Sequence, residues 1–198
     1  CADNNLVLIE DCAQSLGTSL DGKRAGTFGD MSIFSHHSQK NISTLGEGGV
    51  LVVKNPEYAQ IVPMLRHNGH SAYEDQEHYW KPAMSNVDFP KLNGIYIEPN
   101  NYCLGEPQCA VGSMIIDRVD EVNSLKRSRA IQFIDGLAEF EQLTFHRVDN
   151  ERHNYQHLVA FVQNDKRDQF INKLSLDKGI QCVVQYYPLH RYPYYEKH

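Results

Sequence analysis

The sequence lacks the features of a membrane-spanning or polyanion-binding protein. Its apolar runs, such as those at residues 6–9 and 50–53, are far shorter than the about 20 apolar residues that a bilayer-spanning helix needs. Positive charge is also scarce, since the formal net charge is −6. Broad binding to nucleic acid or anionic lipid requires a positive face. We therefore expect a cytoplasmic protein that binds neither nucleic acid nor membrane.

Cysteine motifs and metal-binding motifs are missing as well. The five cysteines are odd in number and form no C-x-x-C pair, so we interpret them as reduced core residues. A metal site could draw on His36, His37, His67 and His70, but neither H-E-x-x-H nor a Cys/His spacing is present. The sequence therefore predicts no metal.

Short apolar runs separated by turn residues predict an α/β fold. Residues 6–9, 31–35 and 50–53 lack two-residue alternation, which favours strands buried on both faces of a helix-covered sheet. Asn55 and Pro56 predict the start of a helix that ends near residues 68–69. Residues 71–101 show no period and predict a long loop, whereas 105–140 predict long or paired helices.

The C-terminal part predicts a smaller α+β domain. We expect a strand at 158–162, a helix at 167–178 that stops at Gly179, and a strand at 179–185. The predicted domains are therefore residues 1–140, with an interdomain helix, and residues 141–198. Because the chain starts at Cys1 and soon enters a buried-type strand, we expect an internal fragment of a protein about twice as long.

Polar side chains follow two of the predicted strands. Asp11 and Gln14 come after the first strand, at the end where open α/β sheets bind ligands. Ser35 closes the next strand, and Lys40 follows in a polar loop that ends in Gly-Glu-Gly-Gly49. A lone lysine in a loop is more often solvated than catalytic. Its spacing from a carboxylate at a strand end favours catalysis.

These motifs resemble the DegT/DnrJ/StrS family of pyridoxal-phosphate-dependent sugar aminotransferases. Residues 8–53 contain, in order, the family's E-D-x-A-Q, F-G-D, F-S-x-x-x-x-K and G-E-G-G segments. Residues 101–110 resemble its N-Y-R-M-x-E-x-Q-A-A segment, and residues 185–190 resemble H-Y-x-P-L-H. The resemblance implies fold type I: part of a large domain with a mixed, mostly parallel sheet covered by helices, followed by part of the small domain.

The resemblance also implies roles for five residues. Lys40 would bond to the aldehyde of pyridoxal phosphate and then act as base and acid. Asp11 would keep the pyridine nitrogen protonated, because a nearby negative charge favours the cationic form. Gln14 would bond the ring oxygen, Ala13 would lie under the ring, and Ser35 would bind the phosphate.

Further residues are implied to contact substrate or a second subunit. Asn101 matches an asparagine that reaches the neighbouring subunit's cofactor, which implies a homodimer with a shared active site. His36, His37 and His190 are candidates for substrate contacts, although packed or solvated histidines are the simpler interpretation. Cys103 departs from the pattern, because an arginine is common at that position.

The implied reaction moves an amino group from an amino acid, usually glutamate, to a keto sugar, usually nucleotide-linked. The product would serve polysaccharide biosynthesis or a glycosylated metabolite. Two alternatives share the cofactor. A sugar dehydratase has a histidine in place of the lysine, so Lys40 argues for the aminotransferase. A non-catalytic sensor that binds pyridoxal phosphate would keep the same residues.

Overall fold

A computed structural model describes residues 1–70, 89–146, 148, 152–184 and 186–197. The chain divides into two compact units, which are described separately. The first unit comprises residues 1–130 and 149–156, and the second unit comprises residues 131–148 and 157–198. Most of the predicted loop at 71–101 lies outside the described residues. The predicted domain boundary near residue 140 stays a prediction.

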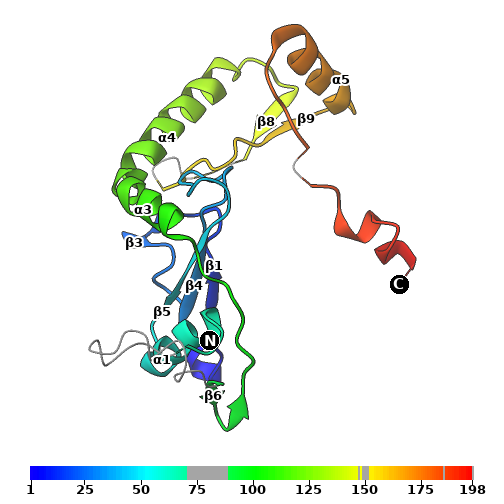
Figure 1. Cartoon of the computed structure of the whole chain (residues 1–198). Helices are drawn as coiled ribbons and strands as arrows, with labels where there is room; N and C mark the ends of the chain where they lie inside the picture. Colours follow the sequence, from blue (N-terminus) through cyan, green and yellow to red (C-terminus); the bar gives the residue numbers. More distant parts are fainter. Residues whose placement is uncertain (71–88, 147, 149–151, 185, 198) are drawn as a thin grey trace. The chain divides into compact units, whose positions relative to one another are not determined.

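The first unit contains a three-stranded sheet with β4 (Met31–Ser35) between β1 (Ile9–Asp11) and β5 (Gly49–Val53) (Figure 1). β1 is parallel to β4, and β5 is antiparallel to it, so the sheet is mixed. The strands predicted at 31–35 and 50–53 are confirmed. The first strand starts later than predicted, because the Leu8 N–H donates to the Asp30 carboxylate (2.8 Å) and the Leu8 carbonyl accepts from the Asp30 N–H (2.8 Å).

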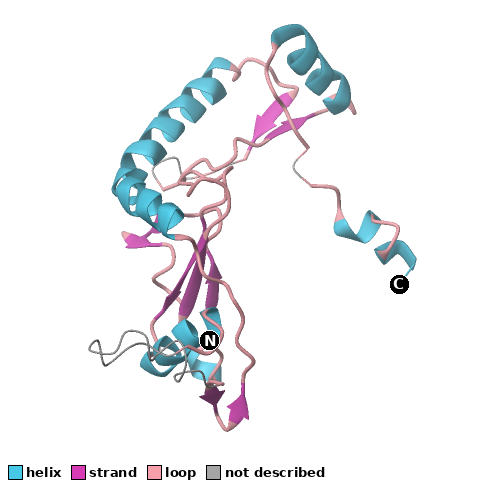
Figure 2. Ribbon diagram, in the orientation of Figure 1, coloured by secondary structure: helices cyan, strands magenta, loops and turns pink. Residues whose placement is uncertain are grey.

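Two short hairpins accompany this sheet (Figure 2). One joins β2 (Ser19–Leu20) to β3 (Lys23–Arg24), and the other joins β6 (Lys91–Leu92) to β7 (Ile95–Tyr96). Their turns, Asp21-Gly22 and Asn93-Gly94, have positive φ at both residues, as the two-residue turns of hairpins require. The prediction of an unbroken loop over 71–101 was therefore wrong at residues 91–96, where the Asn-Gly pair forms a hairpin.

The predicted helices are confirmed. α1 (Pro56–Arg66) starts after Asn55, whose side chain accepts a hydrogen bond from the Glu57 N–H (2.8 Å) and caps the helix. It ends within three residues of the predicted stop. α3 (Glu106–Ile115) and α4 (Val119–Gly136) are joined by the 3₁₀ turn η2 (Ile116–Arg118) and form the predicted pair. A further 3₁₀ turn, η1 (Ala2–Asn4), precedes β1.

The second unit contains an antiparallel pair, β8 (Leu143–Phe145) and β9 (Ala160–Val162), followed by α5 (Arg167–Asn172). α5 continues as a π-helical turn (Lys173–Asp177), and Gly179 follows with φ of +65°, which confirms the predicted stop. The predicted strand at 179–185 was wrong. None of the described residues 180–184 pairs with a strand, and β-forming side chains do not make a strand without a partner. The 3₁₀ turns η4 (Leu189–Arg191) and η5 (Tyr195–Lys197) complete the unit.

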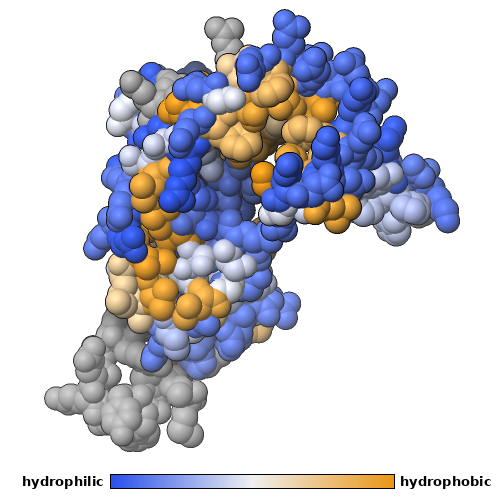
Figure 3. All heavy atoms as spheres, turned by 90° about the horizontal axis from the view of Figure 1, so that it is seen from above, coloured by the Kyte–Doolittle hydropathy of each residue, from blue (hydrophilic) through white to orange (hydrophobic). Residues whose placement is uncertain are grey.

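Several buried residues of the first unit lie in or against the segment that follows β4: His36, Ile42 and Thr44 belong to it, and Asn123 and Asn154 hydrogen-bond with it. Apolar side chains of the sheet reach the surface instead: Ile9, Ile33 and Leu51 share one face and are 59%, 40% and 43% exposed. Figure 3 shows that apolar residues lie at the surface among hydrophilic ones. The buried residues include at least as many polar as apolar side chains. Apart from glycines, they are Cys12, Ser32, His36, Ile42, Thr44, Pro90, Asn123, Ala130, Asn154 and Tyr155.

The cysteines are all free, as predicted, but they are not all core residues. Only Cys12 is buried, and burial raises the pKa of its thiol. Cys103 and Cys109 are exposed, as is Cys1, so the predicted core placement was wrong for these three. For Cys109 the apolar sequence context was misleading, because α3 directs this side chain outward.

Candidate functional site

Asp11 and Ser35 end two parallel strands and therefore lie at the same edge of the sheet. Asp11 pairs with Ile33, and the N–H of Cys12 donates to the Ile33 carbonyl (2.8 Å), which extends the pairing by one residue. The Asp11 carboxylate is exposed and accepts a hydrogen bond from the Ala13 N–H (3.0 Å). It forms no ion pair with any side chain of the described residues. A cationic ligand group at this edge would find a carboxylate available.

Lys40 lies in the segment that connects β4 to β5, residues 36–48, which we call the Lys40 loop. Backbone hydrogen bonds fold this loop back on itself: His36 N–H donates to the Gly48 carbonyl (2.7 Å) and Ser38 N–H to the Gly46 carbonyl (2.6 Å). The Lys40 N–H donates to the His37 carbonyl (2.9 Å), and its side chain is partly exposed. The loop thus presents an amine from a hydrogen-bonded backbone.

Both neighbouring histidines hydrogen-bond within the loop. His36 is buried, with Nδ1 3.3 Å from the Ile42 carbonyl. His37 Nδ1 accepts from the Gln39 N–H (3.1 Å), and its Nε2 lies 3.4 Å from Oε1 of Glu47. These contacts give both rings a role in shaping the loop. Their predicted contacts with substrate stay predictions.

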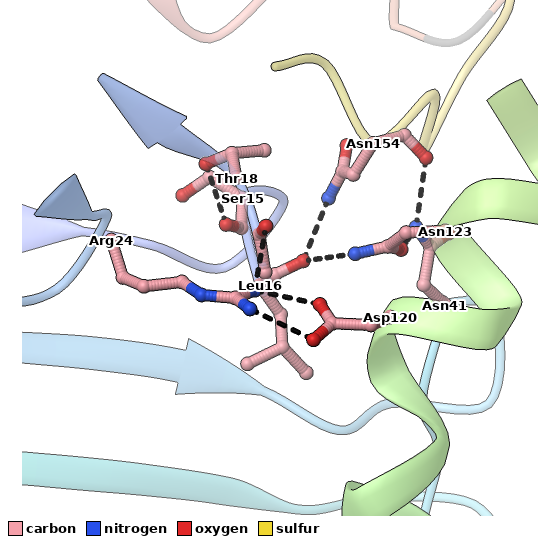
Figure 4. A network of polar contacts seen from close by, with 9 residues as sticks. Ser15, Leu16, Thr18, Arg24, Asn41, Asp120, Asn123 and Asn154 are labelled. Carbon is pink, nitrogen blue, oxygen red and sulfur yellow. Dashed lines mark hydrogen bonds and ion pairs between the residues drawn. The ribbon is translucent and has the colours of Figure 1, made fainter. Parts of the chain in front are cut away.

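Three asparagines connect the Lys40 loop to the residues that follow β1 (Figure 4). Asn41 Nδ2 donates to Oδ1 of Asn123 on α4 (2.9 Å) and to the Asn154 carbonyl (3.1 Å). Asn123 Nδ2 donates to the Leu16 carbonyl (3.0 Å). Asn154 Nδ2 donates to the carbonyls of Gln14 (2.9 Å) and Leu16 (3.2 Å). The structure therefore joins the backbone of Gln14 to the loop of Lys40.

Gln156 and Lys126 complete this cluster, which we call the amide network: Asn41, Asn123, Asn154 and Gln156, with Lys126. Gln156 contacts the loop backbone on both sides of Lys40. Lys126 Nζ donates to Oδ1 of Asn41, and burial lowers the pKa of Lys126. Sequence reasoning missed every member, because the bonds to the Lys40 loop join residues more than 80 positions apart and no motif marks them.

Close packing holds α4 against the segment after β1. Gly17 has φ of +80°, and a Cβ at this position would lie 2.4 Å from Nδ2 of Asn123. Arg24 on β3 and Asp120 on α4 form a bidentate ion pair (2.7 and 2.8 Å), and the hydrogen bond lowers the pKa of Asp120. This ion pair is exposed, so its contribution to the free energy of unfolding is modest. The approach at Gly17 is the tighter constraint.

Glu10 fixes β1 from the face opposite Asp11. Its carboxylate accepts hydrogen bonds from the N–H groups of Gly26 (2.8 Å), Phe28 (2.7 Å) and Gly29 (2.6 Å). Desolvation works to raise the pKa of Glu10, but these donors, with the charge of Lys54, outweigh it and the pKa is lowered. Glu10 therefore serves structure, and it positions the strand that carries Asp11.

Two further residues were predicted from the sequence, Asn101 in the first unit and His190 in the second. Asn101 is exposed beside the end of α1, where it pairs with His67, and its Oδ1 accepts from the Cys103 N–H (3.2 Å). His190 is exposed in η4 of the second unit. The roles predicted for both residues stay predictions.

Neither a metal cluster nor a membrane helix occurs in the part of the chain that the structure describes. No three His, Cys, Asp or Glu side chains there gather as a metal site requires. Within the same residues, no helix combines the length and apolarity needed to cross a bilayer.

Comparison with known proteins matches the whole chain, residues 1–198, to the model of the DegT/DnrJ/EryC1/StrS aminotransferase family. GDP-perosamine synthase of Vibrio cholerae is 29% identical over 200 residues, which cover 99% of this chain and 49% of that protein. The chain spans about half the length of the curated relatives that it matches.

Solved structures show the same fold. The aminotransferase TlmJ from Streptoalloteichus hindustanus matches with a TM-score of 0.79 and 23% identity over 98% of this chain and 49% of that chain. A mutant of GDP-4-keto-6-deoxymannose-3-dehydratase (ColD), with bound GDP-perosamine, matches with a TM-score of 0.72 and 23% identity over 90% and 46%. The predicted fold is thereby confirmed.

Proposed function

Because the chain belongs to the DegT/DnrJ/EryC1/StrS aminotransferase family, we propose that its protein transfers an amino group from glutamate to a keto sugar, with pyridoxal phosphate as cofactor. The observation that carries this proposal is the junction of two segments. The amide network joins the loop that bears Lys40 to the backbone of Gln14, in the segment that directly follows Asp11 at the end of β1. We propose a nucleotide-linked sugar, as the name of the Vibrio cholerae relative suggests.

The side chains at the ends of β1 and β4 and in the Lys40 loop suit pyridoxal phosphate. Asp11 offers an exposed carboxylate for a pyridinium nitrogen. Ser35 Oγ accepts from the His37 N–H (3.3 Å), which leaves its own proton for a phosphate oxygen. Lys40 offers a primary amine for an aldehyde. When bound, the cofactor would supply an electron sink for the carbanion that amino transfer requires.

Each of these residues then has a physical task. The negative charge of Asp11 would stabilise the protonated pyridine nitrogen. Gln14 and Ala13 would orient the ring, while Ser35 would anchor the phosphate. Lys40, once released by the incoming amine, would carry the proton between carbon atoms as base and acid. The amide network would hold Lys40 and Asp11 in register while this occurs.

We also propose roles for one asparagine and three histidines. Asn101 would reach the cofactor of a second copy, so that the protein works as a homodimer with shared active sites. His36, His37 and His190 are proposed to approach the sugar, of which His37 and His190 have the more accessible rings. We propose a cytoplasmic location and a product used in polysaccharide biosynthesis.

A comparison of lysine variants tests the proposal in the full-length protein. Wild type, Lys40→Ala and the control Lys178→Ala are mixed with pyridoxal phosphate, and the near-ultraviolet and visible spectrum is recorded before and after glutamate. We expect a band in wild type and in the control that shifts with glutamate and is abolished by borohydride. Lys40→Ala should lack it. A wild-type protein without any lysine-dependent band would refute the proposed function.

The fold likeness to ColD keeps dehydration as a second candidate. The two reactions differ in their products, because amino transfer adds nitrogen to the sugar and consumes the donor, whereas dehydration removes water. Mass spectrometry of the product from a nucleotide-linked keto sugar and ¹⁵N-glutamate separates them. Nitrogen-15 in the sugar supports the aminotransferase, and loss of water without label supports the dehydratase.

A further inference from the structure

Gln156 is the residue of the amide network that contacts both sides of Lys40. Its side-chain Oε1 accepts a hydrogen bond from the Asn41 N–H (2.9 Å), and its Nε2 donates to the Gln39 carbonyl (2.7 Å). A single amide therefore satisfies a donor and an acceptor on the residues immediately before and after the lysine. Both of these residues are separated from Gln156 by more than 110 positions in the chain.

These two backbone groups belong to the two peptide planes that meet at the Cα of Lys40. The Gln39 carbonyl lies in the plane before that atom, and the Asn41 N–H lies in the plane after it. Because each peptide unit is planar, fixing both planes fixes φ and ψ of Lys40. The direction of its Cα–Cβ bond follows from these two angles. Gln156 thus controls where the amine of Lys40 can reach.

Gln156 is itself held firmly. Its N–H donates to Oδ1 of Asn154 (3.1 Å), and the Asn154 side chain donates to the Gln14 carbonyl (2.9 Å). Tyr155, between the two amides, is buried and has φ of +45°, a conformation that a tyrosine keeps only when its surroundings impose it. Gln156, with its two hydrogen bonds around Lys40, is therefore anchored through Asn154 on the segment that follows Asp11; we call this arrangement the Gln156 clamp.

We infer that Gln156 is a positioning residue for Lys40, and that its amide sets the direction from which the lysine acts in the reaction. This inference rests on the proposed function, since it assigns Lys40 its role. It adds a residue that no motif contains. Gln156 needs no contact with cofactor or substrate, because it acts through the backbone of Gln39 and Asn41.

Two substitutions in the full-length protein test the inference. Gln156→Met keeps the length of the side chain and removes both hydrogen bonds. Gln156→Glu keeps an oxygen that accepts from Asn41 and loses the donor to Gln39. The matched control is Gln163→Met, because Gln163 Nε2 also donates to a backbone carbonyl, that of Glu141 (3.1 Å). Circular dichroism and thermal melting verify that each variant is folded.

The first measurement needs no cofactor. Hydrogen–deuterium exchange of peptides that cover residues 37–44 reports on the Asn41 amide. In Gln156→Met this exchange should be about tenfold faster, the equivalent of one hydrogen bond, whereas Gln163→Met should keep the wild-type rate. Gln156→Glu should lie between the two, because its second carboxylate oxygen is repelled by the Gln39 carbonyl. An unchanged exchange rate of residues 37–44 in Gln156→Met would overturn the inference that Gln156 holds the backbone around Lys40. Faster exchange spread evenly over the whole chain would overturn it as well.

The second measurement follows the glutamate-dependent spectral change in a single turnover. Misdirection of Lys40 should slow this change in Gln156→Met by about 10- to 100-fold, with the half-saturating glutamate concentration unchanged. A wild-type rate in that variant would overturn the inference while the proposed function stands. Absence of the lysine-dependent band in wild type would overturn the proposed function, and the assigned role with it, whatever exchange shows.

Discussion

Gly17 and Gly22 provide a sharp test of how the site is held together, because both have left-handed backbones and only one is crowded. Their φ values are +80° and +76°. An alanine at either position meets the left-handed penalty of about 1–2 kcal/mol. A Cβ on Gly22 has no atom within 4 Å, whereas a Cβ on Gly17 would lie 2.4 Å from Nδ2 of Asn123. The two substitutions therefore differ by the contact with α4.

The size of this difference follows from the hydrogen bonds that Asn123 makes. To accommodate the methyl group, Asn123 must move away from the Leu16 carbonyl (3.0 Å) and from Nδ2 of Asn41 (2.9 Å). Each buried hydrogen bond contributes about 1 kcal/mol net, and an unsatisfied partner costs more. We expect Gly22→Ala to lower the free energy of unfolding by about 1–2 kcal/mol and Gly17→Ala by about 3–5 kcal/mol.

Urea unfolding followed by far-ultraviolet circular dichroism measures both values in the full-length protein. The double variant Gly17→Ala/Asn123→Ala adds a control, because removal of the asparagine side chain relieves the crowding. The double variant should lose less free energy of unfolding than the sum of the losses in the single variants Gly17→Ala and Asn123→Ala. Equal losses for Gly17→Ala and Gly22→Ala, or strict additivity in the double variant, would refute the tight approach of α4.

Two further predictions follow from the pKa shifts. Glu10→Gln should lower the free energy of unfolding at neutral pH by about 1–3 kcal/mol. The folded-state pKa of Glu10 is lowered, so its contribution to the free energy of unfolding is complete above the ordinary pKa of 4.5 and is lost as the pH falls through the folded-state pKa. The free energies of unfolding of wild type and Glu10→Gln should therefore become equal in acid. A difference in urea unfolding that stays constant with pH would contradict this. Cys12 should resist iodoacetamide at neutral pH while Cys103 reacts, because Cys12 is buried and its pKa is raised. Peptide mass spectrometry measures the labelling of each cysteine, and equal labelling of Cys12 and Cys103 would refute the prediction.

Local signals in the sequence predicted the elements whose stability is itself local. Residues 31–35 form β4 as predicted, because an apolar run between turns determines a central strand. Asn55 and Pro56 start α1 as predicted, because the cap bonds within its own turn. The Asn93-Gly94 hairpin carried an equally local signal, and the aperiodic composition of 71–101 concealed it.

The wrong predictions concern elements that depend on partners far away in the sequence. Residues 180–184 have strand-forming side chains, but no strand among the described residues pairs with them. β9 pairs with β8, a strand that the sequence pattern did not predict. The start of β1 was misplaced because the carboxylate of Asp30 engages Leu8. In both cases the deciding contact comes from a residue outside the local pattern.

The candidate site divides along the same line. Lys40 and Asp11 could be singled out from the sequence because the roles proposed for them, an amine that bonds an aldehyde and a carboxylate that stabilises a cation, each suit few residue types. Gln156 and Asn154 supply amide donors and acceptors, which many residues could provide and which no spacing marks. Their importance comes from where they lie, between the backbone of Gln14 and the backbone on either side of Lys40. A candidate residue such as Lys40 can therefore be singled out from its motif, whereas the backbone on either side of it is bonded by a residue more than 110 positions away, which no local pattern marks.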